Sequence, residues 1–161
     1  MKQVFGLMTA LLICGQAQAL SCMRPDPVAS YINASEASDV YYVILGQVTL
    51  DGPAPVRPDT GTFHEAPDLT ASGRVTGKAL GPQGFQKSVN LRVDVTSMCA
   101  GPWCGDFPGQ ERALIFVKQS QPRAVIQMDP CGTQYFSKPA PEMLADVEMC
   151  HRGGACEPAE F

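Results

Sequence analysis

Several features that would place a protein in a large functional class are missing from this sequence. It has no run of like charges, and its 12 Lys and Arg residues are outnumbered by 16 Asp and Glu, for a net charge of −4. A chain without a basic stripe offers little to a nucleic acid or an anionic membrane surface, so we expect neither as a partner. Internal repeats and low-complexity segments are also absent from the sequence.

Recognisable catalytic motifs are lacking as well. Gly-x-Ser-x-Gly does not occur, and the two histidines, His64 and His151, leave few candidates for a general base. Some pair among the 16 acidic residues could always be imagined for glycoside hydrolysis, but context singles out none. We therefore assign no catalytic residue and no cofactor, and expect a non-enzymatic protein.

The first 19 residues have the pattern of a cleavable secretory signal peptide. Lys2 supplies a positive charge, residues 4–14 form an apolar run, and Ala17-Gln18-Ala19 fits the small-x-small cleavage pattern. The run is shorter than the roughly 20 apolar residues that span a bilayer, and no second run of that length follows. We predict cleavage after Ala19 and an exported protein, periplasmic or secreted.

The predicted mature chain, residues 20–161, has the size of one domain. Removal of 19 of the 161 residues leaves 142, enough to bury a core. A cut after Ser21 is also chemically allowed and would leave Cys22 at the N-terminus. We favour the cut after Ala19, which leaves Leu20 first.

The cysteine count fits export. Seven cysteines are encoded and Cys14 lies in the signal, so six remain: Cys22, Cys99, Cys104, Cys131, Cys150 and Cys156. An even set is expected for three disulfides formed in an oxidising compartment. The sequence leaves many pairings open. Proximity favours Cys99–Cys104 and Cys150–Cys156, and Cys22–Cys131 then remains.

Hydrophobic periodicity predicts about five strands with a helix at each end. The strands combine alternation with runs of β-branched or aromatic residues, and cover residues 40–50, 69–80, 89–95, 113–117 and 124–128. Asp26 as a cap and Pro27 in the first turn predict a helix over residues 26–38. Pro141 opens the last helix. Residues 51–68 and 100–110 are rich in Pro and Gly and are predicted to be loops.

Glycine placement indicates curved strands. Gly46 lies in the middle of the first strand and suggests a bulge or a sharp bend. One face of residues 69–80 carries mostly small side chains, which suits a tightly curved strand. Closure of curved strands removes sheet edges. We therefore predict a mainly β fold, a small five-stranded oligonucleotide/oligosaccharide-binding (OB) type barrel stapled by disulfides.

The order of these features resembles the netrin-like module, the OB barrel of tissue inhibitors of metalloproteinases. The mature chain starts near Cys22, and a short helical stretch leads to a strand with an internal glycine, residues 43–48. An alternating strand follows at 89–95, then an apolar strand, a hairpin and a cysteine within 113–131, and a closing helix with a cysteine within 141–150. The resemblance covers most of the mature chain.

This resemblance implies a Greek-key OB barrel whose N-terminal segment is tied to the body by a disulfide, and a role in binding a protein partner. In the best-known members an N-terminal Cys-x-Cys binds the catalytic zinc of a metalloproteinase. This chain has no second cysteine there, so only Cys22 is carried over, as the tether. We expect the contact surface to include Trp103, because Trp is enriched in interface hot spots, and the N-terminal residues Cys22, Met23, Arg24 and Pro25.

Two other functions stay open as alternatives. Cys99 and Cys104 flank Ala-Gly-Pro-Trp and resemble a thioredoxin-type redox site, which would make the chain an envelope thiol-disulfide redox protein. Such sites have two intervening residues rather than four, and a helix N-terminus at the first cysteine. We therefore favour a structural clasp.

The second alternative is a metal-handling protein that uses His151. The metal would be copper, which soft thioethers suit, and the thioether would come from Met23, Met98, Met143 or Met149. Zinc sites normally need four ligands in paired spacing, which His151 does not have. Cys150–Cys156 closing a structural tail around His151 is the favoured interpretation, so no metal site is predicted.

Overall fold

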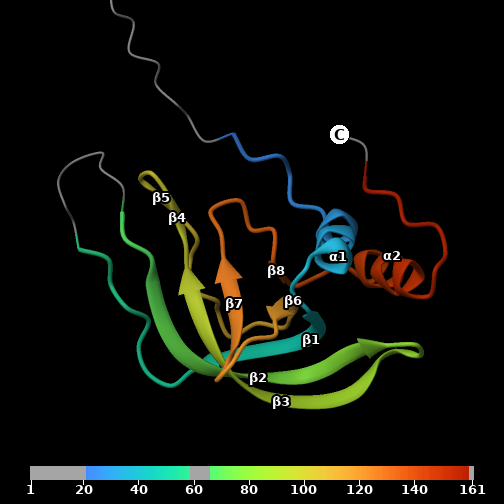
Figure 1. Ribbon diagram of the computed structural model, residues 1–161, viewed down its shortest axis with the longest axis horizontal. Coiled ribbons are helices and arrows are strands. Elements are labelled where there is room, and N and C mark those ends of the chain that lie inside the picture. Colours follow the sequence, from blue (N-terminus) through green and yellow to red (C-terminus); the bar gives the residue numbers. More distant parts are fainter. Residues whose placement is uncertain (1–20, 59–65, 160–161) are drawn as a thin grey trace, which may run out of the picture.

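The computed structural model describes residues 21–58 and 66–159 (Figure 1). The predicted signal peptide lies outside the described residues. The elements run in the order α1 (Pro27–Glu36), β1 (Tyr41–Leu50), β2 (Leu69–Gly81), β3 (Gly84–Ser97), β4 (Cys99–Ala100), β5 (Trp103–Cys104), β6 (Ala113–Lys118), β7 (Ala124–Met128), β8 (Tyr135–Ser137) and α2 (Pro141–His151). The expected mainly β fold with a helix near each end is confirmed.

Six of the strands form one sheet in the order β1-β2-β3-β7-β6-β8. Strand β1 pairs with β6 as well as with β2, so the chain of pairings returns to its first strand. The pair β3–β7 is parallel, whereas the other pairs of this sheet are antiparallel. Strands β4 and β5 form a separate two-stranded hairpin.

The five predicted strands correspond to β1, β2, β3, β6 and β7, and three short strands were not predicted. β3 is longer than expected and extends to the turn at residues 82–83. β4 and β5 lie inside or beside the predicted loop over residues 100–110, and β8 follows the cysteine Cys131. Strands of two or three residues are too short for alternation to mark them.

Gly46 allows a close approach of two strands rather than a bulge. The β1–β2 register runs through it without interruption and places Gly46 opposite Gly77. A Cβ on Gly77 would lie 2.6 Å from Gly46 Cα, and one on Gly46 would strike the carbonyl oxygen of Thr76. Of the two expectations for Gly46, the bulge is therefore wrong, whereas the register does not test the sharp bend. The register shift in this part of the sheet lies between β2 and β3, at Ala79/Leu80.

Apolar side chains form two clusters, one on each side of β1 and β6. Alternate residues point inward and make the larger cluster, which includes Ile44, Val75, Val93, Ile115 and Ile126. The residues between them face the helices and make the smaller cluster, Val43, Leu114, Phe116 and Val147. Strand β6 is buried at every apolar position because it contributes to both. The helices lie side by side at one end of the sheet (Figure 1).

Helix α1 begins where the sequence predicted. The Asp26 carboxylate accepts a hydrogen bond from Ala29 N at 2.7 Å, and Pro27 occupies the first turn. Val28 is buried on the inner face of the helix. Within the described ranges, no helix has both the length and the apolar character needed to cross a membrane.

Candidate functional site

Three disulfides join the cysteines in the pairing favoured from the sequence: Cys22–Cys131, Cys99–Cys104 and Cys150–Cys156. Two of them close short loops. The third spans 109 residues and fastens the N-terminal segment to the turn between β7 and β8. Two of the three disulfides therefore contribute to the surface that the sequence singled out.

The N-terminal segment lies on the surface. Cys22, Met23, Arg24 and Pro25 are all exposed, and the Met23 side chain is 88 % exposed. The Pro25 ring lies beside Gly132, which follows the disulfide partner of Cys22. The segment is thus held at Cys22 by the disulfide, and next to that cysteine it presents the large apolar side chain of Met23.

Trp103 projects from the disulfide-closed hairpin of β4 and β5. Cys99 is paired with Cys104 across the two strands, and Ala100 with Trp103. The hairpin is fixed to the chain before β2, because the Asp68 carboxylate accepts a hydrogen bond from Cys99 N at 2.8 Å. The Trp103 side chain stays 44 % exposed. An exposed indole on a fixed loop loses little conformational entropy when it is covered.

A cleft of about 410 Å³ lies between the segment that leaves β5 and the turn that follows β7. Cys104, next to Trp103, lines one side, and Cys131, the disulfide partner of Cys22, lines the other. In Figure 1 the β4–β5 hairpin, the β7–β8 turn and the N-terminal segment all lie at the upper side. The structure thus brings both predicted binding elements to the borders of one cleft.

The cleft is acidic. Three carboxylates line it, from Asp106, Glu111 and Asp129, and no Lys or Arg does. Asp129 holds the turn that carries Cys131, because its carboxylate accepts hydrogen bonds at 2.8 Å from Cys131 N, Thr133 N and Thr133 Oγ1. The electrostatic field in the cleft therefore favours a cationic group.

Tyr135 also lines this cleft, and its hydroxyl oxygen is buried without a hydrogen bond to the described residues. Burial, with a smaller contribution from the charge of Glu111, raises the pKa of Tyr135 to about 12. The phenol therefore stays protonated at neutral pH and is a hydrogen-bond donor. Sequence reasoning missed both Tyr135 and the three carboxylates, because the cleft forms only when two distant segments meet.

The two alternative sites are the Cys99/Cys104 pair and His151. Cys99 and Cys104 lie on antiparallel strands, away from any helix N-terminus in the described part of the chain. His151 ends α2, where its Nδ1 lies 3.0 Å from the Tyr31 hydroxyl. No group of three or more His, Cys, Asp or Glu side chains within residues 21–58 and 66–159 is arranged to hold a metal ion. His64 lies outside the described residues.

The methionines do not gather around His151 as a set. Met98 lies at the end of β3, where its sulfur accepts a hydrogen bond from Gln127 Nε2 at 3.4 Å. Met23 is in the N-terminal segment, and Met143 and Met149 are on α2.

Compared with known proteins, this chain matches no family model, no curated protein and no solved structure. The geometry of the cleft and its borders is therefore the basis for assigning a function.

Proposed function

We propose that the chain is an exported, non-enzymatic module that binds a protein partner at the cleft between the β4–β5 hairpin and the disulfide-tied N-terminal segment. The observation that carries this proposal is that two apolar side chains, Met23 and Trp103, are exposed on segments that are each fixed by a disulfide beside that cleft. Large exposed side chains on rigid supports are typical of interface hot spots.

The pairing order supports a five-stranded, OB-like Greek-key barrel as the scaffold. The pairings β1-β2-β3-β7-β6 return to β1, and β3–β7 is the one parallel pair among them. β8 then adds to β6 outside this ring. A closed sheet is rigid and leaves its loops to carry the binding residues.

The disulfide tether of the N-terminal segment supports the netrin-like resemblance, whereas the zinc-binding Cys-x-Cys of the inhibitors does not occur here. The link from Cys22 to Cys131 fastens the N-terminal segment as the resemblance implies. Met23 and Arg24 follow Cys22, however, so the second cysteine of a zinc-binding Cys-x-Cys is missing. We therefore propose protein binding by the same end of the module without inhibition of a metalloproteinase.

Export is part of the proposal. The three disulfides fit a chain that folds in an oxidising compartment, outside the cytoplasm. The predicted signal peptide would deliver it there, to the periplasm or the exterior.

Site-specific crosslinking tests the proposed surface. A photoreactive side chain would replace Trp103 or Met23 one at a time, with Val56 as the matched control, because Val56 is 91 % exposed and lines no part of the cleft. We expect positions 103 and 23 to yield an adduct with the same protein and position 56 to yield none. Adducts that are equal at all three positions, or absent at positions 103 and 23, would overturn the proposal.

A further inference from the structure

The outer face of β2 and β3 is polar throughout its middle length. Val75, Val93 and Val95 point into the core, so the residues between them point to solvent. Every outward position of both strands, over residues 70–78 and 88–96, is polar or charged. These positions are Thr70, Ser72, Arg74, Thr76, Lys78, Ser88, Asn90, Arg92, Asp94 and Thr96.

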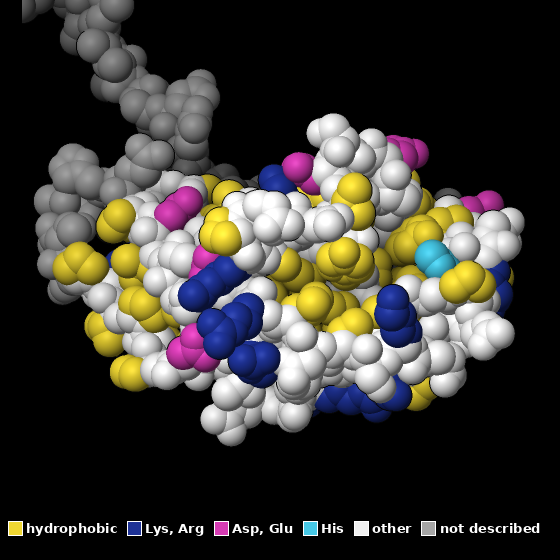
Figure 2. Space-filling view, turned by 60° about the horizontal axis from the view of Figure 1, so that its bottom comes forward, with side chains coloured by type: hydrophobic (Ala, Val, Ile, Leu, Met, Phe, Trp, Pro, Cys, Tyr) yellow, Lys and Arg dark blue, Asp and Glu magenta, His cyan; other side chains and the backbone are white. Residues whose placement is uncertain are grey.

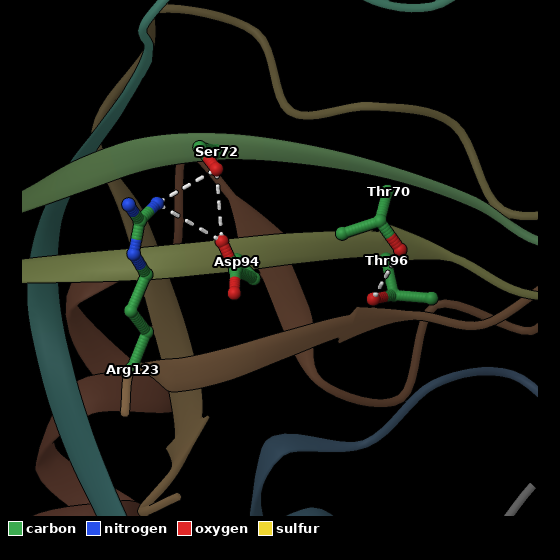
Figure 3. Close-up of polar contacts among 5 residues, drawn as sticks. All are labelled: Thr70, Ser72, Asp94, Thr96 and Arg123. Atoms are coloured by element: carbon green, nitrogen blue, oxygen red, sulfur yellow. Dashed lines mark hydrogen bonds and ion pairs between the residues drawn. The ribbon is translucent and has the colours of Figure 1, made fainter. Parts of the chain in front are cut away.

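Most pairs of side chains that lie directly opposite each other on β2 and β3 are complementary on this face. The hydroxyls of Thr70 and Thr96 lie 3.1 Å apart, and the Ser72 hydroxyl donates to Asp94 Oδ1 at 3.0 Å (Figure 3). Such cross-strand pairs are the usual stabilising contacts of a sheet.

One level breaks this pattern, because Arg74 and Arg92 are directly opposite each other. Like charges in that relation destabilise a sheet. Arg74 Nη1 donates to Asn90 Oδ1 at 2.6 Å, whereas the Arg92 side chain makes no hydrogen bond or ion pair within residues 21–58 and 66–159. The guanidinium of Arg92 is therefore available to an external group.

A third arginine extends this level across β3. Ala124 of β7 pairs with Val93, so Arg123, which precedes Ala124, comes beside Arg92. Arg123 Nη1 donates to Ser72 Oγ at 2.7 Å and lies 3.3 Å from Asp94 Oδ1, reaching over β3 as Figure 3 shows. Neighbouring strands are about 4.8 Å apart, so the backbones of the three arginine residues lie within about 10 Å of one another.

The charge of this face has the opposite sign to that of the chain. Four cations, Arg74, Lys78, Arg92 and Arg123, accompany a single carboxylate, Asp94, for a formal charge of +3 in a chain whose net charge is −4. Figure 2, which turns the lower side of Figure 1 toward the reader, shows Lys and Arg side chains gathered close together. The sequence contains no basic run, but the register of the sheet assembles a basic row.

We propose that Arg74, Arg92 and Arg123 bind the sulfate or phosphate groups of an anionic polysaccharide. Arginine forms paired, charge-assisted hydrogen bonds to such oxyanions. The flanking hydroxyl and amide side chains, such as Thr76 and Asn90, suit the hydroxyls of a sugar. This site goes beyond the proposed function, since none of its arginines lines the cleft.

The same face argues against the two other common polyanions. Single-stranded nucleic acid is usually held by aromatic side chains that stack on its bases, and a membrane surface by apolar side chains that insert. Neither kind occurs at the outward positions of residues 70–78 and 88–96. Arginines among hydroxyls recognise charge and hydrogen-bonding groups alone.

Binding of fluorescent dextran sulfate to the mature chain tests the proposal, with uncharged dextran and a single-stranded oligonucleotide of equal charge as comparisons. We expect salt-dependent binding of dextran sulfate and none of dextran. R92Q should raise the dissociation constant about tenfold, the usual loss for a charge-assisted hydrogen bond, and R74Q/R92Q should raise it further.

K87Q is the matched control, because Lys87 is exposed on the same strand but pairs with the core-facing Ala79 and so lies on the other face. Its dissociation constant should stay within about twofold of the wild-type value. The proposal is overturned if dextran sulfate does not bind, if R92Q and K87Q behave alike, or if the oligonucleotide binds as tightly as dextran sulfate. None of these results bears on the cleft, which is tested separately at positions 23 and 103.

Discussion

At the scale of single residues, Asp26 connects three parts of the chain. Its Oδ1 accepts from Ala29 N at 2.7 Å and caps α1, whereas its Oδ2 accepts from Ala159 N in the C-terminal tail at 3.2 Å. It also directly follows the exposed N-terminal segment that borders the cleft. One carboxylate therefore sets where the helix starts and holds the tail against that start.

Replacement of Asp26 by Ala should lower the free energy of unfolding by about 1 kcal/mol, the usual cost of losing an N-cap. D26N is the matched variant, because Asn caps about as well as Asp and keeps an oxygen for the first turn. We expect D26N to lose less than half as much, as measured by urea midpoints. If both variants lose the same amount, the charge of the carboxylate and not its capping bond stabilises this region.

At the scale of secondary-structure elements, the sequence predicted the strands that are long enough to show a hydrophobic pattern. Alternation marked the strands of residues 69–80 and 89–95, and the continuous apolar run of residues 113–117 marked β6, which is buried on both faces. It could not mark β8, which has three residues, or the two-residue strands of the hairpin. Those strands form because a neighbouring segment of backbone pairs with them in the folded chain.

The same limit applies to the candidate sites. The exposed Met23 and Trp103 could be singled out by residue type and by the neighbouring cysteines. The cleft between them could not, because it depends on how the turn after β7 packs beside the segment after β5. The basic row of Arg74, Arg92 and Arg123 could not be predicted either. Alternation places Arg74 and Arg92 at outward positions, but only the register shows that one lies opposite the other.

Gly46 offers a test of how closely β1 and β2 must approach. In G46A, the new methyl group would strike the carbonyl oxygen of Thr76 and lie 2.9 Å from Gly77 Cα, so pairing at the centre of the sheet must loosen. We expect a loss of about 1–3 kcal/mol in the free energy of unfolding, the usual cost of overpacking.

G52A is the control, because a Cβ on Gly52 meets no atom within 4 Å. It should change the free energy of unfolding by less than about 0.5 kcal/mol. Thermal and denaturant unfolding of the two variants side by side gives the answer. Equal stability of G46A and G52A would mean that β1 and β2 separate to admit the methyl group without cost.

At the scale of the whole molecule, the three disulfides act over different ranges. Two close loops with sequence separations of 5 and 6 residues, and they shape the hairpin and the tail. The third has a separation of 109 residues and joins the start of the described chain to the turn between β7 and β8. On the chain-entropy account, a link of that length stabilises by about 4.8 kcal/mol and each short one by about 2 kcal/mol.

The long disulfide should therefore be the one on which folding depends most. Replacing Cys22 and Cys131 together by Ser should lower the free energy of unfolding by about 2–5 kcal/mol, the usual loss for a small secreted domain. The matched variant replaces Cys150 and Cys156, which close only the tail after α2, and it should lose less. Denaturant midpoints and slopes for both double variants decide the order. If the tail pair is the costlier loss, the N-terminal segment contributes little to the fold, and the support that its tether gives to a netrin-like module is withdrawn.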